Sequence, residues 1–195
     1  MPKLHWEDFT AGQVAEYGPQ TVTAEDIKAF AAEFDPQPMH LDEEAARQSL
    51  VGGLCASGWH TCAIMMRIVA DGFILDSSSM GATGCEEIKW LAPVRPGDRL
   101  RVRMEVLATR ASASRPDMGF VNARLDLLNA DGVRVMTLTP HLMFGRRPPA
   151  ADAGGPGVSF DQVAIEVRRA NTPPIGAKAP DGSGSSSSQP VSSRR

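Results

Sequence analysis

The segment 54–69 reads LCASGWHTCAIMMRIV and is the strongest helix candidate in the chain. Apolar side chains occupy most sides of the helix that this segment predicts, and Arg67 is its only acidic or basic residue apart from one histidine. A helix with so little polar surface is expected to lie centrally, covered by other elements. Gly52 and Gly53 come directly before the segment, so we expect the chain to break there and the helix to open at Gly53.

The later part of the chain predicts strands that can cover this helix. Val102, Met104 and Val106 alternate with Arg101, Arg103 and Glu105, which is the period of a half-buried strand. The same alternation or β-type composition predicts strands at 80–91, 121–127 and 133–144, with turn compositions at 95–98 and 129–132. Consecutive strands joined by such short connections favour an antiparallel sheet.

The first part of the chain predicts a further strand at 13–22 and then short helices. Thr23 can cap a helix with Asp26 in the capping-box position, and Asp42 can cap a second short helix over 43–47. Within the first helix, the spacing of Ile27, Phe30, Ala31 and Phe34 predicts one buried face. The whole pattern indicates an α+β fold, in which an antiparallel sheet packs one face onto the central helix.

The loop between these two helices carries the most informative chemistry. It places Asp35 and His40 five residues apart, and both groups can exchange protons near neutral pH. A helical path would turn the two side chains about 140° apart, and we expect Pro36 and Pro38 to prevent that path and fix an extended one. The segment is therefore either an acid–base pair aimed into a cleft or a proline-rich connector whose polar groups satisfy the backbone.

Composition narrows the class of protein. The chain has 195 residues, 42% of them hydrophobic and 22% charged, which suits one substantial core. A formal net charge of −3 and the lack of a dense Lys/Arg stripe argue against nucleic-acid binding. No apolar run reaches membrane-spanning length and charged residues interrupt the amino terminus, so we expect a cytoplasmic protein without a membrane partner.

The ends of the chain and its cysteines give two further expectations. We expect a single domain over 1–147 and, over 148–195, a tail rich in Pro, Gly and Ser that is largely disordered. Cys55, Cys62 and Cys85 cannot all pair within one chain, so we expect reduced thiols. Cys55 and Cys62 lie two turns apart on the predicted helix, too far to share a metal ion, and we assign them to packing.

Three motifs resemble the MaoC-like acyl dehydratases, also called (R)-specific enoyl-CoA hydratases. They are Phe34 to Asp42, Gly52 to Thr61, and Lys89 to Asp98, and the resemblance covers roughly residues 8–145. It implies the hot-dog fold, in which an antiparallel sheet wraps a central helix. It also implies a hydro-lyase that adds water reversibly to a trans-2-enoyl-CoA thioester to give an (R)-3-hydroxyacyl-CoA.

The resemblance also implies the roles of individual residues. Asp35 and His40 share a water, and the amide of Gly53 polarises the thioester carbonyl. The predicted substrate-binding residues are Gln37, Met39, Leu54 and Thr61. No metal or redox cofactor is expected, since coenzyme A is part of the substrate.

Some residues depart from the family pattern or have a second interpretation. Phe34 stands where a glycine is common, and Gln37 stands where an asparagine is usual. The Thr61 hydroxyl either positions substrate or bonds back to the carbonyl four residues earlier. The cations Arg67, Lys89 and Arg95 are either contacts for nucleotide phosphates or ordinary solvated surface charges.

Two other functions use the same cleft. A hot-dog thioesterase would direct water at the carbonyl carbon, and a non-catalytic subunit would bind an acyl thioester without turnover. The expected partners are an acyl-CoA or other acyl thioester and a second copy of the chain. Exposed sheet edges and the family resemblance favour a homodimer or a dimer of dimers.

Overall fold

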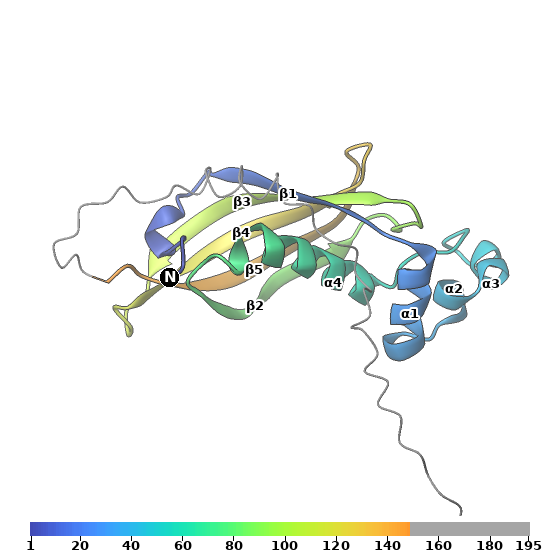
Figure 1. Ribbon diagram of the computed structural model, residues 1–195, viewed down its shortest axis with the longest axis horizontal. Helices are drawn as coiled ribbons and strands as arrows, with labels where there is room; N and C mark the ends of the chain where they lie inside the picture. The colour runs from blue at the N-terminus through green and yellow to red at the C-terminus, as the bar shows by residue number, and fades with distance from the viewer. Residues whose placement is uncertain (149–195) are drawn as a thin grey trace, which may run out of the picture.

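The computed structural model describes residues 1–148, and the predicted tail lies outside them except for its first residue. Five antiparallel strands form one sheet in the order β1-β3-β4-β5-β2. The strands are β1 (Val14–Thr21), β2 (Ser79–Trp90), β3 (Arg99–Ala111), β4 (Met118–Leu128) and β5 (Arg134–Gly145). Helix α4 (Gly58–Val69) lies against this sheet in Figure 1, which is the hot-dog arrangement that the resemblance implied.

The core lies between α4 and the sheet. Val102, Met104 and Val106 of β3 are buried, as their alternation predicted, and Ile64 and Met65 of α4 are buried opposite the sheet. The helix is not covered on every side, because Met66 keeps 52% of its surface exposed. The central position of the helix is confirmed, but one of its faces remains open.

Helix α4 begins four residues later than the sequence predicted. Ser57 is its N-cap, and the Ser57 hydroxyl accepts a hydrogen bond from the amide of Trp59. Residues 54–57 run outside the helix, where the Ala56 amide donates to the Val94 carbonyl at 2.9 Å. The expectation that Gly53 opens the helix is therefore wrong, since the helix begins at Gly58 and the Ser57 side chain caps the Trp59 amide.

The short helices lie together at one end of the sheet (Figure 1). Helix α1 (Ala24–Phe34) has the capping box of Thr23 and Asp26, and α3 (Glu43–Gln48) begins after the Asp42 cap, as predicted. The buried face of α1 is shorter than predicted, because Phe34 is 63% exposed.

Helix α2 (Pro38–Leu41) corrects the expectation of an extended path from Asp35 to His40. Proline is favoured in the first turn of a helix, where its missing N–H leaves no bond unmade. Pro38 therefore starts a single turn that includes His40, and only the stretch before it is extended.

The sheet order places β2 beside β5 instead of beside β3. The segment after β2 crosses to the other part of the sheet, so two strands that follow one another in sequence are not neighbours in space. Strand β2 forms one edge of the sheet, and most of its residues are exposed.

Ion pairs join the two ends of the described chain. The short helix η1 (Trp6–Asp8) contributes Glu7 and Asp8, which pair with Arg146 at 3.0 Å and Arg147 at 2.7 Å. This contact lies at the end of the sheet opposite α1, α2 and α3 (Figure 1). A second short helix, η2 (Ala70–Ile74), follows α4. Among residues 1–148, no helix is long and apolar enough to cross a membrane.

Candidate active site

Asp35 is the first residue after α1, and two side chains donate hydrogen bonds to its carboxylate. Ser57 Oγ donates to Oδ2 at 2.6 Å, and Gln37 Nε2 donates to Oδ1 at 2.8 Å. These bonds, from Ser57 first and Gln37 second, hold the pKa of Asp35 below its ordinary value of 3.8. The charged form is therefore favoured, and the side chain remains 18% exposed to solvent.

His40 is held in one orientation by the backbone of the segment before α4. Its Nδ1 lies 2.8 Å from the carbonyl oxygen of Cys55, and the residue is only 4% exposed. A carbonyl can only accept a hydrogen bond, so Nδ1 must carry the proton. The other ring nitrogen, Nε2, lies on the side that faces Asp35, and it presents a lone pair whenever the ring carries a single proton.

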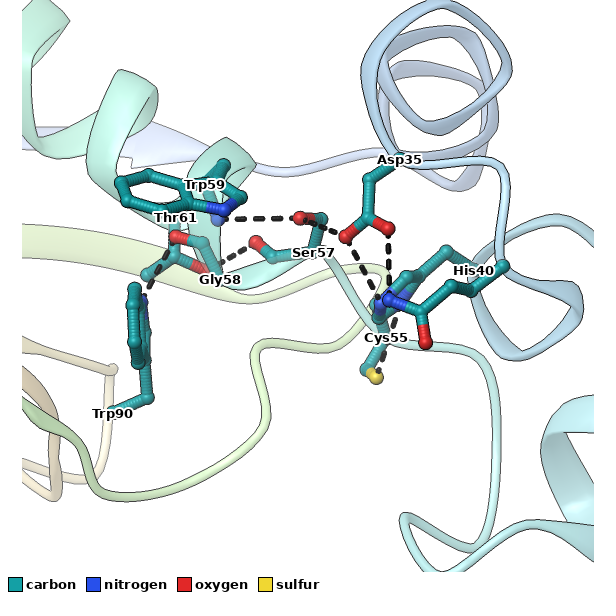
Figure 2. Close-up of polar contacts among 9 residues, drawn as sticks. Asp35, His40, Cys55, Ser57, Gly58, Trp59, Thr61 and Trp90 are labelled. Atoms are coloured by element: carbon teal, nitrogen blue, oxygen red, sulfur yellow. Dashed lines mark hydrogen bonds and ion pairs between the residues drawn. The ribbon is translucent and has the colours of Figure 1, made fainter.

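The side chains of Asp35 and His40 point toward one another in Figure 2, with Oδ2 and Nε2 3.6 Å apart. A carboxylate oxygen and an unprotonated ring nitrogen are both acceptors, and 3.6 Å is too long for a direct hydrogen bond. A water molecule has two protons and can donate one to each acceptor. The geometry thus suits one water molecule between the two groups.

Ser57 is a site residue that the sequence analysis missed. Its hydroxyl donates to Asp35 and accepts from the Trp59 amide, so one side chain joins the start of α4 to the carboxylate. The available signal was the preference for serine at helix N-caps. That preference would have identified Ser57 as the cap of α4, but its contact with Asp35 depends on tertiary structure.

The structure brings one of the four predicted substrate-binding residues into this cluster. Gln37 bonds directly to Asp35, whereas Leu54 is buried in the core and Met39 packs partly buried against it. The Thr61 hydroxyl donates to the Ser57 carbonyl at 3.1 Å, which is the second of the two geometries considered for it. Thr61 is buried, and this hydrogen bond joins its side chain to the Ser57 backbone.

Gly53 lies in the loop before α4 with φ of +152°, a value that favours glycine. Its carbonyl accepts a hydrogen bond from Arg95. The amides at the positive end of the helix dipole belong to Gly58 and its neighbours instead. Among the residues that the structure describes, the amides of Gly58 and His60 have no recorded hydrogen-bond partner.

Two tryptophans flank the start of α4 (Figure 2). Trp90 Nε1 donates to the Gly58 carbonyl at 2.9 Å, and the Trp59 and Trp90 rings meet edge to face with centroids 5.7 Å apart. A methyl group at Gly58 would lie 2.8 Å from the Trp90 ring, so the glycine is needed for this close approach. Trp59 is 60% exposed, so an apolar ring faces solvent at the start of α4.

The three candidate phosphate contacts all have partners within the chain. Arg67 pairs with Asp71 at 2.8 Å, and Lys89 pairs with Glu87 at 2.6 Å. Arg95 donates to main-chain carbonyls of the loop before α4. Within residues 1–148, no three His, Cys, Asp or Glu side chains are grouped so that they could hold a metal ion.

Comparison with known proteins finds one matching family model and several similar proteins. The family model described as "MaoC like domain" matches residues 8–123. The crystal structure of a MaoC-like dehydratase from Rhodospirillum rubrum is 47% identical with a TM-score of 0.70, covering 75% of this chain and 99% of that one. The unliganded R-hydratase PhaJ1 from Pseudomonas aeruginosa is 22% identical with a TM-score of 0.61, covering 80% of this chain and 97% of that one, which shows a shared fold. The uncharacterized protein YdeM of Bacillus subtilis (strain 168) is 36% identical over 130 residues, which are 66% of this chain and 90% of that protein.

Proposed function

Since this chain belongs to the family of MaoC-like domains, we propose that it is a hydro-lyase acting on acyl thioesters. The reaction is reversible addition of water to the double bond of a trans-2-enoyl-CoA, which yields an (R)-3-hydroxyacyl-CoA. The observation that carries this proposal is that Asp35 Oδ2 and His40 Nε2 face one another and lie 3.6 Å apart.

The mechanism follows from what the two acceptors can do. Asp35 and His40 each accept one hydrogen bond from a water whose oxygen faces C3 of the substrate. As the oxygen bonds to C3, the pair takes up a proton, and the π electrons move through C2 to the thioester carbonyl. The pair then returns one proton to C2 on the same face, which restores the resting charge state.

The start of α4 provides the stabilisation of negative charge on the carbonyl oxygen. The Gly58 amide points from the positive end of a 12-residue helix and lies next to Ser57, which touches Asp35. We therefore propose the amides of Gly58 and its neighbours as the oxyanion donors, whereas the family resemblance implied the amide of Gly53. Losing one such donor costs about 3 kcal/mol in other enzymes.

The test is hydration of crotonyl-CoA by the purified full-length chain. We expect loss of the conjugated enoyl absorbance without release of free thiol. Asp35→Asn and His40→Ala should each lower turnover by roughly 10²- to 10⁴-fold. The matched controls are Asp131→Asn in the turn between β4 and β5, and His141→Ala, which pairs with Glu86 on the sheet.

Two results would contradict the proposal. Release of thiol at the rate of substrate loss would identify a thioesterase that directs water at the carbonyl carbon. Near-normal hydration by either the Asp35 or the His40 variant would remove the pair from the reaction.

We also propose that two copies of the chain associate through one face. The face consists of Trp59, Ala63 and Met66, which share one side of α4, and Trp90 of the edge strand β2, which packs on Trp59. Within residues 1–148, the outer edge of β2 has no strand partner. Exposed sheet edges and contiguous apolar surface both favour association.

Sedimentation of the full chain should give twice the 20.8 kDa mass of one copy, or four times that mass if dimers pair. Met66→Glu should weaken association because it places a charge in the apolar face. A monomer in the wild type, or unchanged sedimentation of Met66→Glu, would contradict this assembly.

A further inference from the structure

The guanidinium of Arg95 donates its hydrogen bonds to main-chain carbonyls. Its guanidinium donates to the carbonyls of Val51, Gly53 and Leu54, and the bond to Leu54 is 3.2 Å long. Among the residues that the structure describes, no carboxylate pairs with it. An arginine presents five donors in a rigid fork, so it can hold several carbonyls at fixed relative positions. Arg95 therefore acts as a clamp on the loop of residues 51–54.

The loop of residues 51–54 needs a side-chain donor such as Arg95 because its backbone conformation leaves its carbonyls without regular hydrogen bonds. Gly52 and Gly53 have φ of +68° and +152°, so this stretch forms neither helix nor strand. Its carbonyls lack the partners that regular structure would give them, and buried backbone groups are costly when unpaired. The close fit shows at Gly53, where an added Cβ would lie 3.2 Å from Nη1 of Arg95.

The turn that carries Arg95 is itself anchored. The Arg95 amide donates to Asp98 Oδ2 at 2.7 Å. The Val22 amide donates to the Asp98 carbonyl at 2.9 Å, and the Gly97 amide donates to the Val22 carbonyl at 2.8 Å. These bonds fix the turn to the end of β1. Arg95 therefore holds the loop of residues 51–54 at a set position relative to the sheet.

The loop that Arg95 holds is followed by the residue that contacts His40. The residue after Leu54 is Cys55, whose carbonyl accepts the hydrogen bond from Nδ1 of His40 at 2.8 Å. We infer that Arg95 is a positioning residue, which holds the Cys55 carbonyl in place and so fixes the ring tautomer that leaves Nε2 of His40 unprotonated. This inference rests on the proposed function, because it assigns Nε2 a proton to accept.

Loss of the clamp has a defined chemical consequence. When the Cys55 carbonyl moves away, Nδ1 loses its acceptor and the proton can occupy Nε2 instead. A protonated Nε2 would donate to Asp35 and no longer accept a proton from water. Arg95 thus affects the chemical step without touching the substrate.

The test compares Arg95→Lys and Arg95→Gln with Arg101→Lys in the full chain. Arg101 is a matched control, because it also donates to a main-chain carbonyl, that of Asn129, but lies away from the site. Nitrogen-15 NMR of the His40 ring should show one tautomer in the wild type and in Arg101→Lys, and a mixture in both Arg95 variants. In the hydration assay, kcat should fall roughly 10- to 100-fold with little change in KM.

The outcomes separate the inference from the function on which it rests. A single wild-type tautomer in folded Arg95→Lys, or a rise in KM at unchanged kcat, would overturn the inference, and the second result would assign Arg95 to substrate binding. Absence of hydration by the wild type would overturn the proposed function alone, because the tautomer is read without turnover. Thermal unfolding of each variant verifies that it is folded.

Discussion

Ser57→Ala is the substitution that most directly tests the site, because one hydroxyl makes two hydrogen bonds. It accepts from the Trp59 amide as the N-cap of α4 and donates to Asp35 at 2.6 Å. Alanine removes both bonds and adds no bulk. Ser57→Gly removes the bond to Asp35 but remains an acceptable N-cap, so the two variants separate the contributions.

The expected loss of stability is the sum of two contributions. Replacing a serine N-cap by alanine lowers the free energy of unfolding by about 1 kcal/mol, and replacing it by glycine lowers it by only a few tenths of a kcal/mol. A hydrogen bond to a charged group contributes about 1.5–3 kcal/mol. The lower figure applies here, because Asp35 is 18% exposed and can be rehydrated. Ser57→Ala should therefore lose about 2.5 kcal/mol and Ser57→Gly about 2 kcal/mol at neutral pH.

The sign of the pH dependence follows from the lowered pKa of Asp35. A carboxylate with a lowered pKa stabilises the fold above the pKa of the unfolded chain, and this stabilisation is lost as the pH falls through the folded value. Ser57 is the first cause of that lowering, so Ser57→Ala raises the pKa of Asp35. The stability difference from the wild type should shrink in acid, and the acid limb of kcat/KM should move to higher pH.

Urea unfolding at neutral and acid pH measures the first effect, and the rate profile on crotonyl-CoA measures the second. Ser57→Thr retains the hydroxyl and is the conservative control. An acid limb in Ser57→Ala that coincides with the wild type would refute the coupling of Ser57 to Asp35. Equal stability of Ser57→Ala and the wild type would refute both bonds.

Three further predictions concern the surroundings of the site and the core. Gly58→Ala should cost about 1–3 kcal/mol and alter the near-ultraviolet circular dichroism, because its methyl group would lie 2.8 Å from Trp90; unchanged spectra would contradict this. Burial lowers the pKa of His60 below its ordinary value of 6.5, although the charge of Asp26 acts in the opposite direction. The free energy of unfolding measured in urea should therefore fall as the pH drops below about 6.5, and His60→Phe should remove that fall. Met104→Ala should cost about 2–5 kcal/mol of unfolding free energy and Leu107→Ala much less, since Met104 is fully buried and Leu107 is 39% exposed; similar losses would argue against this core.

The strands and α1 could be predicted because their signals are local. Val102, Met104 and Val106 alternate with polar neighbours, and each of them is buried in β3. Thr23 and Asp26 form the capping box that their spacing predicted. The order of strands has no such local signal, because the pairing of β2 with β5 depends on which edge the crossing segment reaches.

The errors near the site arose where two local signals competed. Apolar residues from Leu54 onward favoured a longer helix, but Ser57 is a better cap and Arg95 holds the carbonyls of the preceding loop. Pro38 was interpreted as preventing a helix, although a proline in the first turn starts one. The residue types of Asp35 and His40 were enough to propose them as a pair, and the structure brings their side chains within 3.6 Å. The contact of Ser57 with Asp35 depends on tertiary structure.

The pairing of Glu7 and Asp8 with Arg146 and Arg147 has a practical consequence. It anchors the amino terminus at the end of the sheet away from α1 and α2 (Figure 1). Asp35 directly follows α1, and His40 lies in α2. A tether attached ahead of Met1 would therefore hold the molecule with its acid–base pair directed away from a solid support. Immobilised in this way, the protein should leave the approach to the pair unobstructed for a bulky acyl donor.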